Sequence, residues 1–299
     1  MKTTMIKSNL KRFEDYLAAK GHSKKTGASV VKGVRQFEKW AISQPFKKTV
    51  NATYSEILLY IKHCTTSGNA KKTVSLKLLF LRHYYEFLVK TGQATQNPVE
   101  GMQIQGVKRN ILHNILSREE LDKLYQVHKH PGLTGQRNKV IVGLFIFQGV
   151  RPEELALLQV SDIDLKSGKI NIPGARRTNA RTLDLQPAQI MEVWEYIQNT
   201  RPALLLQTSK TTEQLFISAG NGVNLPNTLQ YFLSQLKALD KRITNLKQLR
   251  ASVITAWLKV YNLRRAQYMA GHRYVSSTEK YKINDLDGLI EDITKYHPL

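Results

Sequence analysis

The sequence lacks several features that define whole classes of protein. Its 299 residues include one cysteine, Cys64, so no disulfide can form within the chain and no cysteine cluster can bind zinc. The longest apolar run, residues 140–147, is far shorter than the roughly 20 residues that a membrane-spanning helix requires. The first residues lead into charged positions instead of an apolar stretch, so no secretory signal is expected. These absences predict a soluble protein of the cytoplasm.

Acidic residues are also scarce. The chain has 45 Lys and Arg against 23 Asp and Glu, a formal net charge of +22, and residues 1–112 hold 20 of the basic and 6 of the acidic side chains. Such an excess predicts a polyanionic partner, and it favours double-stranded DNA because each phosphate contact releases counterions. Lysine-rich helices that are merely solvated are the alternative. An anionic membrane is disfavoured because no segment joins a long basic face to an apolar aromatic one.

Hydrophobic periodicity predicts a helical DNA-binding domain over residues 1–105. Ser8 is the expected cap of its first helix, and Gly21 the expected end. Further helices are expected over about 28–42, 55–64 and 71–90. Basic residues on the last of these are candidates for phosphate contacts: Lys71, Lys72, Lys77 and Arg82. Residues 93–112 show little apolar periodicity and are interpreted as an interdomain stretch. The linker itself is assigned to residues 106–115, just before the second domain.

Residues 116–299 predict a second domain, mainly helical with a small β-hairpin or sheet. Ser117 and Glu120 form a capping-box pattern, and a buried helix is expected over about 138–148. Strands are expected over 169–172 and 181–185, joined by a polar loop. Further helices are expected near 187–199, 225–239, 246–261, 262–270 and 285–296. The fold class is therefore α+β, with helices dominating both domains.

Cutting and rejoining DNA without a metal requires a side-chain nucleophile and fixed cations around the phosphate. Tyrosine suits the first role because its phosphate ester stores the bond energy for religation. Arginine suits the second because its planar fork binds two phosphate oxygens and keeps its charge. The segment Gly149-Val-Arg151-Pro-Glu-Glu154 places Arg151 before a proline at the start of a helix, a natural anion site, with Glu154 one turn further on.

Three other segments carry side chains for the same chemistry. Lys247 and Arg250 are three residues apart, which puts both cations on one helix face. His272 follows Gly271, and Tyr281 lies nine residues later. Each segment by itself is equally typical of a solvated surface or a structural side chain, so it is their order that carries information.

That order resembles the tyrosine recombinase (phage-integrase) family, in particular its two-domain Xer-like members, over nearly the whole chain. The resemblance implies that Arg151 and Arg250 clamp the scissile phosphate and that His272 contacts it. It implies that Tyr281 is the nucleophile of a 3′-phosphotyrosyl intermediate and that Glu154 supports the site. The implied activity is site-specific DNA recombination: integration or excision, inversion, or dimer resolution.

Two positions depart from the family pattern. The histidine expected in the second motif is Lys247, whose ordinary pKa does not suit a base at neutral pH. The hairpin lysine that serves as the family's general acid is replaced by Arg176, with Arg177 beside it as a DNA-binding candidate. Arginine can stabilise a leaving oxygen but is a poor proton donor. Lys169, at the strand start, is a weaker candidate, and the departures favour a mobile-element enzyme.

The expected partners are duplex DNA and further copies of the chain. The family resemblance implies a homodimer on a core site and a homotetramer in the synapse, with exchange of the apolar and acidic helix expected over 285–296. An accessory DNA-bending protein is a further expected partner, and the protein is expected at the nucleoid. No cofactor and no metal are expected.

Two other functions stay open at this stage. A metal-dependent nuclease or transposase would need clustered carboxylates, and the chain offers only Asp162-x-Asp164, which is more typical of a turn. A catalytically silent DNA-binding protein that keeps the recombinase fold is the other alternative. The departures at Lys247 and Arg176 are the features that favour it.

Overall fold

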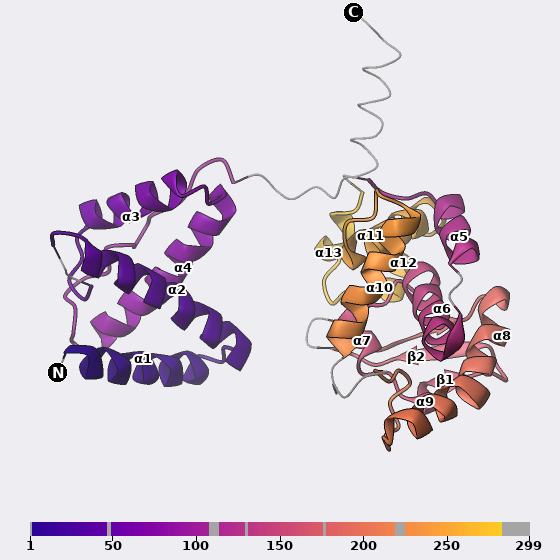
Figure 1. Cartoon of the computed structure of the whole chain (residues 1–299). Coiled ribbons are helices and arrows are strands. Elements are labelled where there is room, and N and C mark those ends of the chain that lie inside the picture. The colour runs from indigo at the N-terminus through magenta and orange to yellow at the C-terminus, as the bar shows by residue number, and fades with distance from the viewer. Residues whose placement is uncertain are drawn as a thin grey trace, which may run out of the picture. The chain divides into compact units, whose positions relative to one another are not determined.

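The computed structural model describes residues 2–46, 49–107, 114–128, 131–175, 178–218 and 225–282 (Figure 1). The chain divides into two compact units, residues 1–110 and 111–299. Among the described residues, no helix is long and apolar enough to cross a membrane.

The first unit is built from four helices: α1 (Lys2–Ala19), α2 (Lys24–Ser43), α3 (Tyr54–Thr66) and α4 (Lys71–Lys90). Its core is rich in aromatic rings because all four helices turn large side chains toward one another. Phe13 meets the ring of Tyr84 edge-on at 5.2 Å, and Phe37 meets Tyr60 at 5.0 Å. These rings are almost completely buried, so they supply much of the apolar area that holds the four helices together.

Two expectations for this unit were wrong in their boundaries. Helix α1 begins at Lys2, so Ser8 lies inside the helix and does not cap it. The segment after α4 is also more ordered than its composition indicates, because Ala94, Val99 and Met102 are buried in the core of this unit. The backbone carbonyl of Met102 accepts a hydrogen bond from Arg82, which ties this segment to α4.

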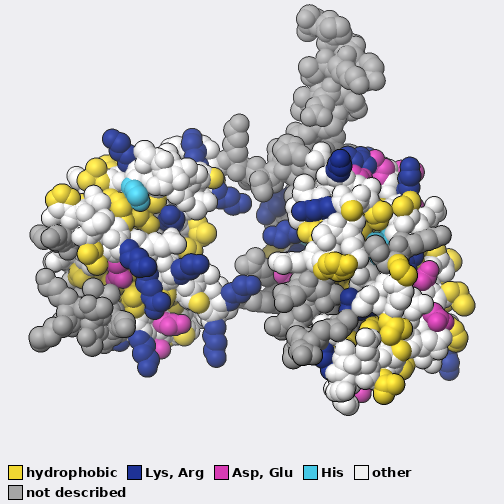
Figure 2. Space-filling view, viewed as in Figure 1, with side chains coloured by type: hydrophobic (Ala, Val, Ile, Leu, Met, Phe, Trp, Pro, Cys, Tyr) yellow, Lys and Arg dark blue, Asp and Glu magenta, His cyan; other side chains and the backbone are white. Residues whose placement is uncertain are grey.

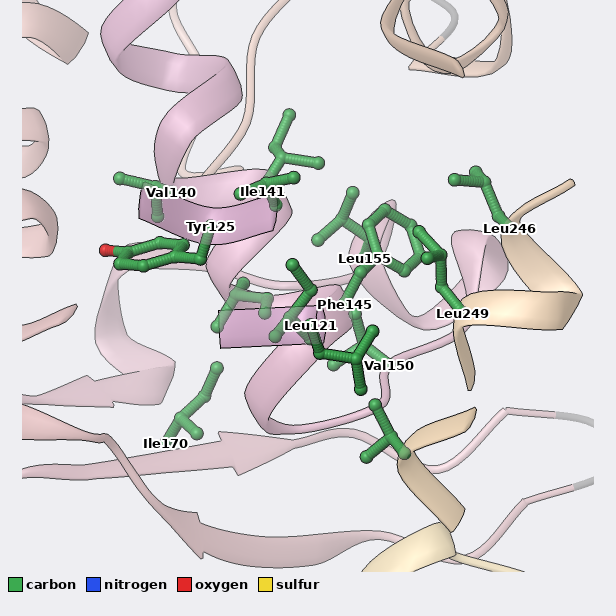
Figure 3. Close-up of a cluster of buried hydrophobic side chains, with 14 of the residues drawn as sticks. Leu121, Tyr125, Val140, Ile141, Phe145, Val150, Leu155, Ile170, Leu246 and Leu249 are labelled. Atoms are coloured by element: carbon green, nitrogen blue, oxygen red, sulfur yellow. The ribbon is translucent and has the colours of Figure 1, made fainter. Parts of the chain in front are cut away.

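The second unit surrounds one buried helix, α6 (Gly132–Phe147), whose apolar residues face all directions. Helices α5 (Arg118–Val127), α8 (Pro187–Glu195), α9 (Arg201–Thr208) and α11 (Leu246–Val260) pack around it. Figure 3 shows Phe145 of α6 among side chains from α5, from the segment after α6 and from α11. The predicted capping box of Ser117 and Glu120 is present at the start of α5.

The remaining elements of this unit are shorter. They are α7 (Pro152–Leu155), the 3₁₀ turn η1 (Val160–Asp162), β1 (Ile163–Asp164), β2 (Lys169–Ile172), β3 (Arg181–Asp184), the π turn η2 (Tyr196–Thr200), α10 (Leu225–Leu239), α12 (Leu263–Ala270) and α13 (Ser276–Glu279). The helix expected over 187–199 is therefore α8 followed by η2, which leads into α9. The helix expected over 285–296 lies outside the described residues.

The sheet is antiparallel with the order β1-β2-β3. The two predicted strands pair as expected, with Ile170 opposite Leu183 and Ile172 opposite Arg181. Along β3, Arg181 and Leu183 are buried while Thr182 and Asp184 are exposed. This alternation points a charged side chain, Arg181, into the interior.

The central position of α6 leads to a stability prediction. Phe145 has no exposed surface, so Phe145→Ala should leave a cavity and lower the free energy of unfolding by about 3–5 kcal/mol. Hydrogen exchange of the α6 amides in the full chain measures this for the second unit alone. The control, Leu206→Ala on α9, removes a side chain that is 85% exposed and should change stability by no more than about 0.5 kcal/mol. Equal effects of the two substitutions would contradict the assignment of α6 as the core helix.

Candidate active site

Arg151 stands at the start of α7, where its extended backbone (φ −94°, ψ 152°) precedes Pro152 in the first helical turn. Its backbone N–H donates to Glu154 Oε2 at 2.9 Å, so the carboxylate caps the helix. The predicted helix start at this arginine is therefore confirmed. The Arg151 side chain is half-buried, so it can meet a ligand at the surface.

Glu154 is the buried anion of the site. Its two carboxylate oxygens accept hydrogen bonds from Arg181 at 2.9 and 3.0 Å, and neither side chain has any exposed surface. Arg250 Nη1 lies 3.8 Å from Glu154 Oε2. Burial alone would raise the pKa of Glu154, but the hydrogen bonds and charge of Arg181, with the charge of Arg250, leave the pKa lowered. Glu154 is therefore ionised at neutral pH.

Arg250 projects from α11 and is 5% exposed. Its Nη1 donates to the carbonyl of Gly149, and its Nη2 donates to the carbonyl of Ala270. These bonds join α11 to the turn before α7 and to the end of α12. Burial lowers the pKa of Arg250 to about 10, helped by its cationic neighbours and opposed by Glu154. The guanidinium thus stays protonated at neutral pH.

His272 follows Gly271, which ends α12 in the left-handed region at φ +64°. The imidazole is 4% exposed, with Nε2 3.4 Å from Arg250 Nη2 and Nδ1 2.9 Å from Thr278 Oγ1. Burial, followed by the charges of Arg250 and other arginines, lowers the pKa of His272 to about 3. The ring is therefore neutral. Because a guanidinium only donates, Nε2 is the acceptor and the Nδ1 proton points to Thr278.

Tyr281 completes the group. Its ring lies nearly parallel to that of His272, at 8°, with the ring centroids 6.0 Å apart. Its backbone N–H donates to the carbonyl of Thr278 at 3.0 Å, which anchors the turn that carries it. The charge of Arg151 lowers the pKa of both Arg250 and His272, so this arginine also lies beside them. Four segments that are distant in sequence thus converge on one site.

Comparisons with known proteins identify the family of the chain. The phage integrase family matches residues 114–286, and the N-terminal SAM-like domain of phage integrases matches residues 10–92. The chain belongs to the phage integrase family.

Individual relatives cover nearly the same length. The chain is 26% identical over 297 residues to tyrosine recombinase XerC of Bacillus licheniformis, covering 98% of this chain and 97% of that protein. Its fold is similar to XerH site-specific recombinase bound to a palindromic difH substrate (TM-score 0.74, 18% identity, 92% and 81% of the two chains). It is also similar to a lambda integrase dimer bound to a COC′ core site (TM-score 0.67, 18% identity, 92% and 94%).

In this integrase-family chain, the basic residue of the second motif is not buried with the other site residues. Lys247 is exposed in the first turn of α11, while Arg250 one turn later is buried. The two residues therefore lie on the same side of α11, but Lys247 is exposed to solvent and Arg250 is buried. Lys169 lies opposite Asp184, at the end of β2 away from the hairpin loop.

Arg176 and Arg177 lie outside the described residues, so their predicted roles stay predictions. The residues that follow them are fixed to the site. Thr178 forms an isolated β-bridge with His272, and the N–H of Asn179 donates to the carbonyl of Gly271 at 2.9 Å. The exit of the hairpin loop therefore lies against the turn that carries the histidine.

Arg181 is the functional residue that the sequence analysis missed. The available signal was a charged residue at an inward position of an alternating strand, in a chain whose Glu154 needed a buried counterion. The pairing itself could not be predicted, because it joins residues 27 positions apart through tertiary structure.

The basic candidates of the first unit differ in their environments. Lys71 and Lys72 are exposed, whereas Lys77 Nζ lies 3.6 Å from Cys64 Sγ and Arg82 Nη2 donates to the carbonyl of Met102 at 2.8 Å. Figure 2 shows many Lys and Arg side chains and few acidic ones on the visible face of this unit. The surface is therefore suited to phosphate contacts, with Lys71 and Lys72 the better placed candidates.

The paired aspartates of the sequence act within turns. Asp162 accepts a hydrogen bond from the N–H of Gln159, and Asp164 accepts bonds from Lys166 and Ser167. Within the described part of the chain, no group of three or more His, Cys, Asp or Glu side chains could hold a metal ion.

The lowered pKa of His272 leads to a prediction about stability and pH. In the unfolded chain this histidine takes up a proton near its ordinary pKa of about 6.5, but in the folded chain only near 3. Its contribution to stability is therefore complete above about pH 6.5 and is lost as the pH falls. Between pH 6.5 and 5, the stability of the wild type relative to His272→Gln should fall by up to about 1.4 kcal/mol per pH unit. Amide exchange in the second unit measures it, and parallel pH curves for the two proteins would contradict a neutral buried imidazole.

Proposed function

We propose that Tyr281 is the nucleophile with which this chain, a site-specific DNA recombinase, cuts and rejoins DNA. The observation that carries the proposal is the stacking of Tyr281 on His272, which in turn contacts Arg250. In the forward step the Tyr281 Oη–P bond forms and the P–O5′ bond breaks, leaving a 3′-phosphotyrosyl link and a 5′-hydroxyl. The 5′-hydroxyl of a partner strand then attacks the phosphotyrosine and reverses the step.

Arg151 and Arg250 would bind the non-bridging oxygens of the scissile phosphate. Negative charge increases on these oxygens in the transition state, and cations that are already oriented stabilise it without reorganisation. Arg250 is held in place by the carbonyls of Gly149 and Ala270. Neutral His272 can donate to a phosphate oxygen only with its proton on Nε2, so in the DNA complex its Nδ1 would accept from Thr278 Oγ1 and its Nε2–H would face the phosphate in place of Arg250.

Two proton transfers accompany the exchange: the Tyr281 hydroxyl releases its proton to solvent water, and the departing 5′-oxygen takes up a proton from solvent water. We assign the leaving-group side to the hairpin loop, where Arg176 would stabilise the oxygen by hydrogen bonding. Lys247 would contribute positive charge near the phosphate from the first turn of α11. Glu154 supports the arginines and contacts no substrate.

Duplex DNA is the proposed partner. Phosphate contacts from the first unit would involve Lys71 and Lys72, with Lys77 and Arg82 nearby, and Arg177 would contribute from the second unit. The similarity to a lambda integrase dimer on a core site supports a homodimer on DNA. A homotetramer in the synapse and an accessory DNA-bending protein complete the proposed assembly, at the nucleoid.

The first test is capture of the covalent intermediate. The full chain is incubated with fragmented genomic DNA in EDTA, and covalent complexes are isolated, sequenced and mapped by mass spectrometry. Wild type should carry DNA on Tyr281, and Tyr281→Phe should give no adduct because it lacks the attacking oxygen. Tyr274→Phe is the matched control, since Tyr274 is seven residues away, 72% exposed and outside the stacked pair.

The other outcomes identify the alternatives. Salt-sensitive DNA binding without any adduct would favour a catalytically silent DNA-binding protein. Cleavage that EDTA abolishes would favour a metal-dependent nuclease. An adduct on another tyrosine would overturn the assignment of the nucleophile.

A second test addresses the carboxy-terminal segment. Leu286, Leu289, Ile290 and Ile293 recur at helical spacing, which suits a helix that docks on a neighbouring protomer. Deletion after Asn284 should therefore abolish cooperative binding to a two-site DNA while leaving single-site affinity within about threefold, because the phosphate contacts lie elsewhere. Mobility-shift titrations on one-site and two-site DNA measure both. Unchanged cooperativity would disprove the exchange.

A further inference from the structure

The geometry points to Arg181 as the positioning residue of this site: through Glu154 and the turn at Gly271, it fixes where Arg250, Arg151 and His272 meet the phosphate. This inference rests on the proposed function, since it concerns the same phosphate.

The first contact is with Glu154. Both oxygens of this carboxylate are taken by the two terminal nitrogens of Arg181, at 2.9 and 3.0 Å. The same carboxylate holds the backbone N–H of Arg151 at 2.9 Å and lies 3.8 Å from Arg250 Nη1. One buried anion therefore touches the segments that carry both clamping arginines, and Arg181 determines where that anion sits.

The second contact is with the turn before His272. A Cβ added to Gly271 would lie 2.6 Å from Arg181 Nη1 and 3.0 Å from the carbonyl oxygen of Asn179. The backbone of this turn therefore lies directly against the guanidinium of Arg181. The turn is also bonded to the residues just before β3, through Asn179 to Gly271 and through Thr178 to His272. The position of His272 is thus set from the same strand that carries Arg181.

These contacts explain why an arginine serves at this position. A lysine would present one nitrogen and could not engage both carboxylate oxygens in a planar fork. Without the guanidinium, the free charge of Glu154 would attract Arg250, whose Nη1 is already 3.8 Å away. Arg250 would then pair with the carboxylate in place of the phosphate. Arg181 therefore acts by keeping Glu154 occupied and never contacts the substrate.

The charges of the group support the same role. Among the described residues of the site, the guanidiniums of Arg181 and Arg250 lie against the carboxylate of Glu154, and the charge of Arg151 acts on Arg250. Pairing Arg181 with Glu154 leaves the charge of the other two arginines uncompensated. A phosphate anion can then provide the missing counterion.

The test is single-turnover cleavage of the DNA that the adduct experiment recovers, by the full chain carrying Arg181→Gln, Arg181→Lys or the double change Arg181→Gln with Glu154→Gln. Arg181→Gln should slow formation of the Tyr281 adduct by about 100-fold with DNA affinity within about threefold, because the clamp is displaced and the binding surface is not. Arg181→Lys should be intermediate. The double variant should recover about tenfold over Arg181→Gln, because it removes the carboxylate that captures Arg250.

A second substrate distinguishes a positioning role of Arg181 from a general structural effect of its substitution. A methylphosphonate at the scissile position carries no charge on its non-bridging groups, so it depends less on the arginine clamp. The rate ratio of phosphate to methylphosphonate should fall at least tenfold in Arg181→Gln. Arg137→Gln is the matched control, since Arg137 is 3% exposed and bonds to Ile217 and Asn138 away from the site. It should leave the ratio unchanged.

Each outcome has a definite meaning. The positioning role would be overturned if Arg181→Gln kept the wild-type ratio of phosphate to methylphosphonate rates, or if Arg137→Gln lowered that ratio equally. Either result would leave the recombinase assignment intact. A wild type that forms no adduct would overturn both. Amide exchange shows whether Arg181→Gln folds. If it does not, the phosphate-to-methylphosphonate rate ratio is measured in Arg181→Lys and in the double variant. A ratio equal to that of wild type in both would overturn the positioning role.

Discussion

The site depends on one buried negative charge. Glu154 has no exposed surface, yet it stays ionised because Arg181 supplies two hydrogen bonds and a compensating charge. The same carboxylate caps α7 through the backbone of Arg151 and lies next to Arg250. Since a buried charge without partners is very costly, the positions of the surrounding arginines cannot vary independently. The order of the active site follows from this constraint.

The surrounding fold supplies rigid attachment points for these groups. Arg250 is anchored to backbone carbonyls on two different segments, and His272 is held between Arg250 and Thr278. Arg250 and His272 therefore have internal partners before any DNA arrives. Preorganisation of this kind means that little conformational entropy is lost when the phosphate binds.

Much of this could be predicted from the sequence. The helix over residues 71–90, the paired strands and the helix start at Arg151 all have strong local signals: apolar periodicity, alternation and an arginine-proline pair. Local sequence signals did not predict features that depend on tertiary contacts. Helical spacing put Lys247 and Arg250 on one face but could not show that only Arg250 is buried. The role of Arg181 depends on a partner in another element, and the ordered segment after α4 depends on three buried apolar residues.

The turn at Gly271 packs against Arg181, a side chain 90 positions earlier in the sequence. Its backbone adopts a conformation that disfavours side chains, and the space that a side chain would need is filled by Arg181. A smaller residue at position 181 would free only part of that space, because the carbonyl oxygen of Asn179 is also close and the positive φ would remain, and it would leave Glu154 without its partner. Gly271, Arg181 and Glu154 are therefore constrained together, because a substitution at one of them disturbs the packing or pairing of the others.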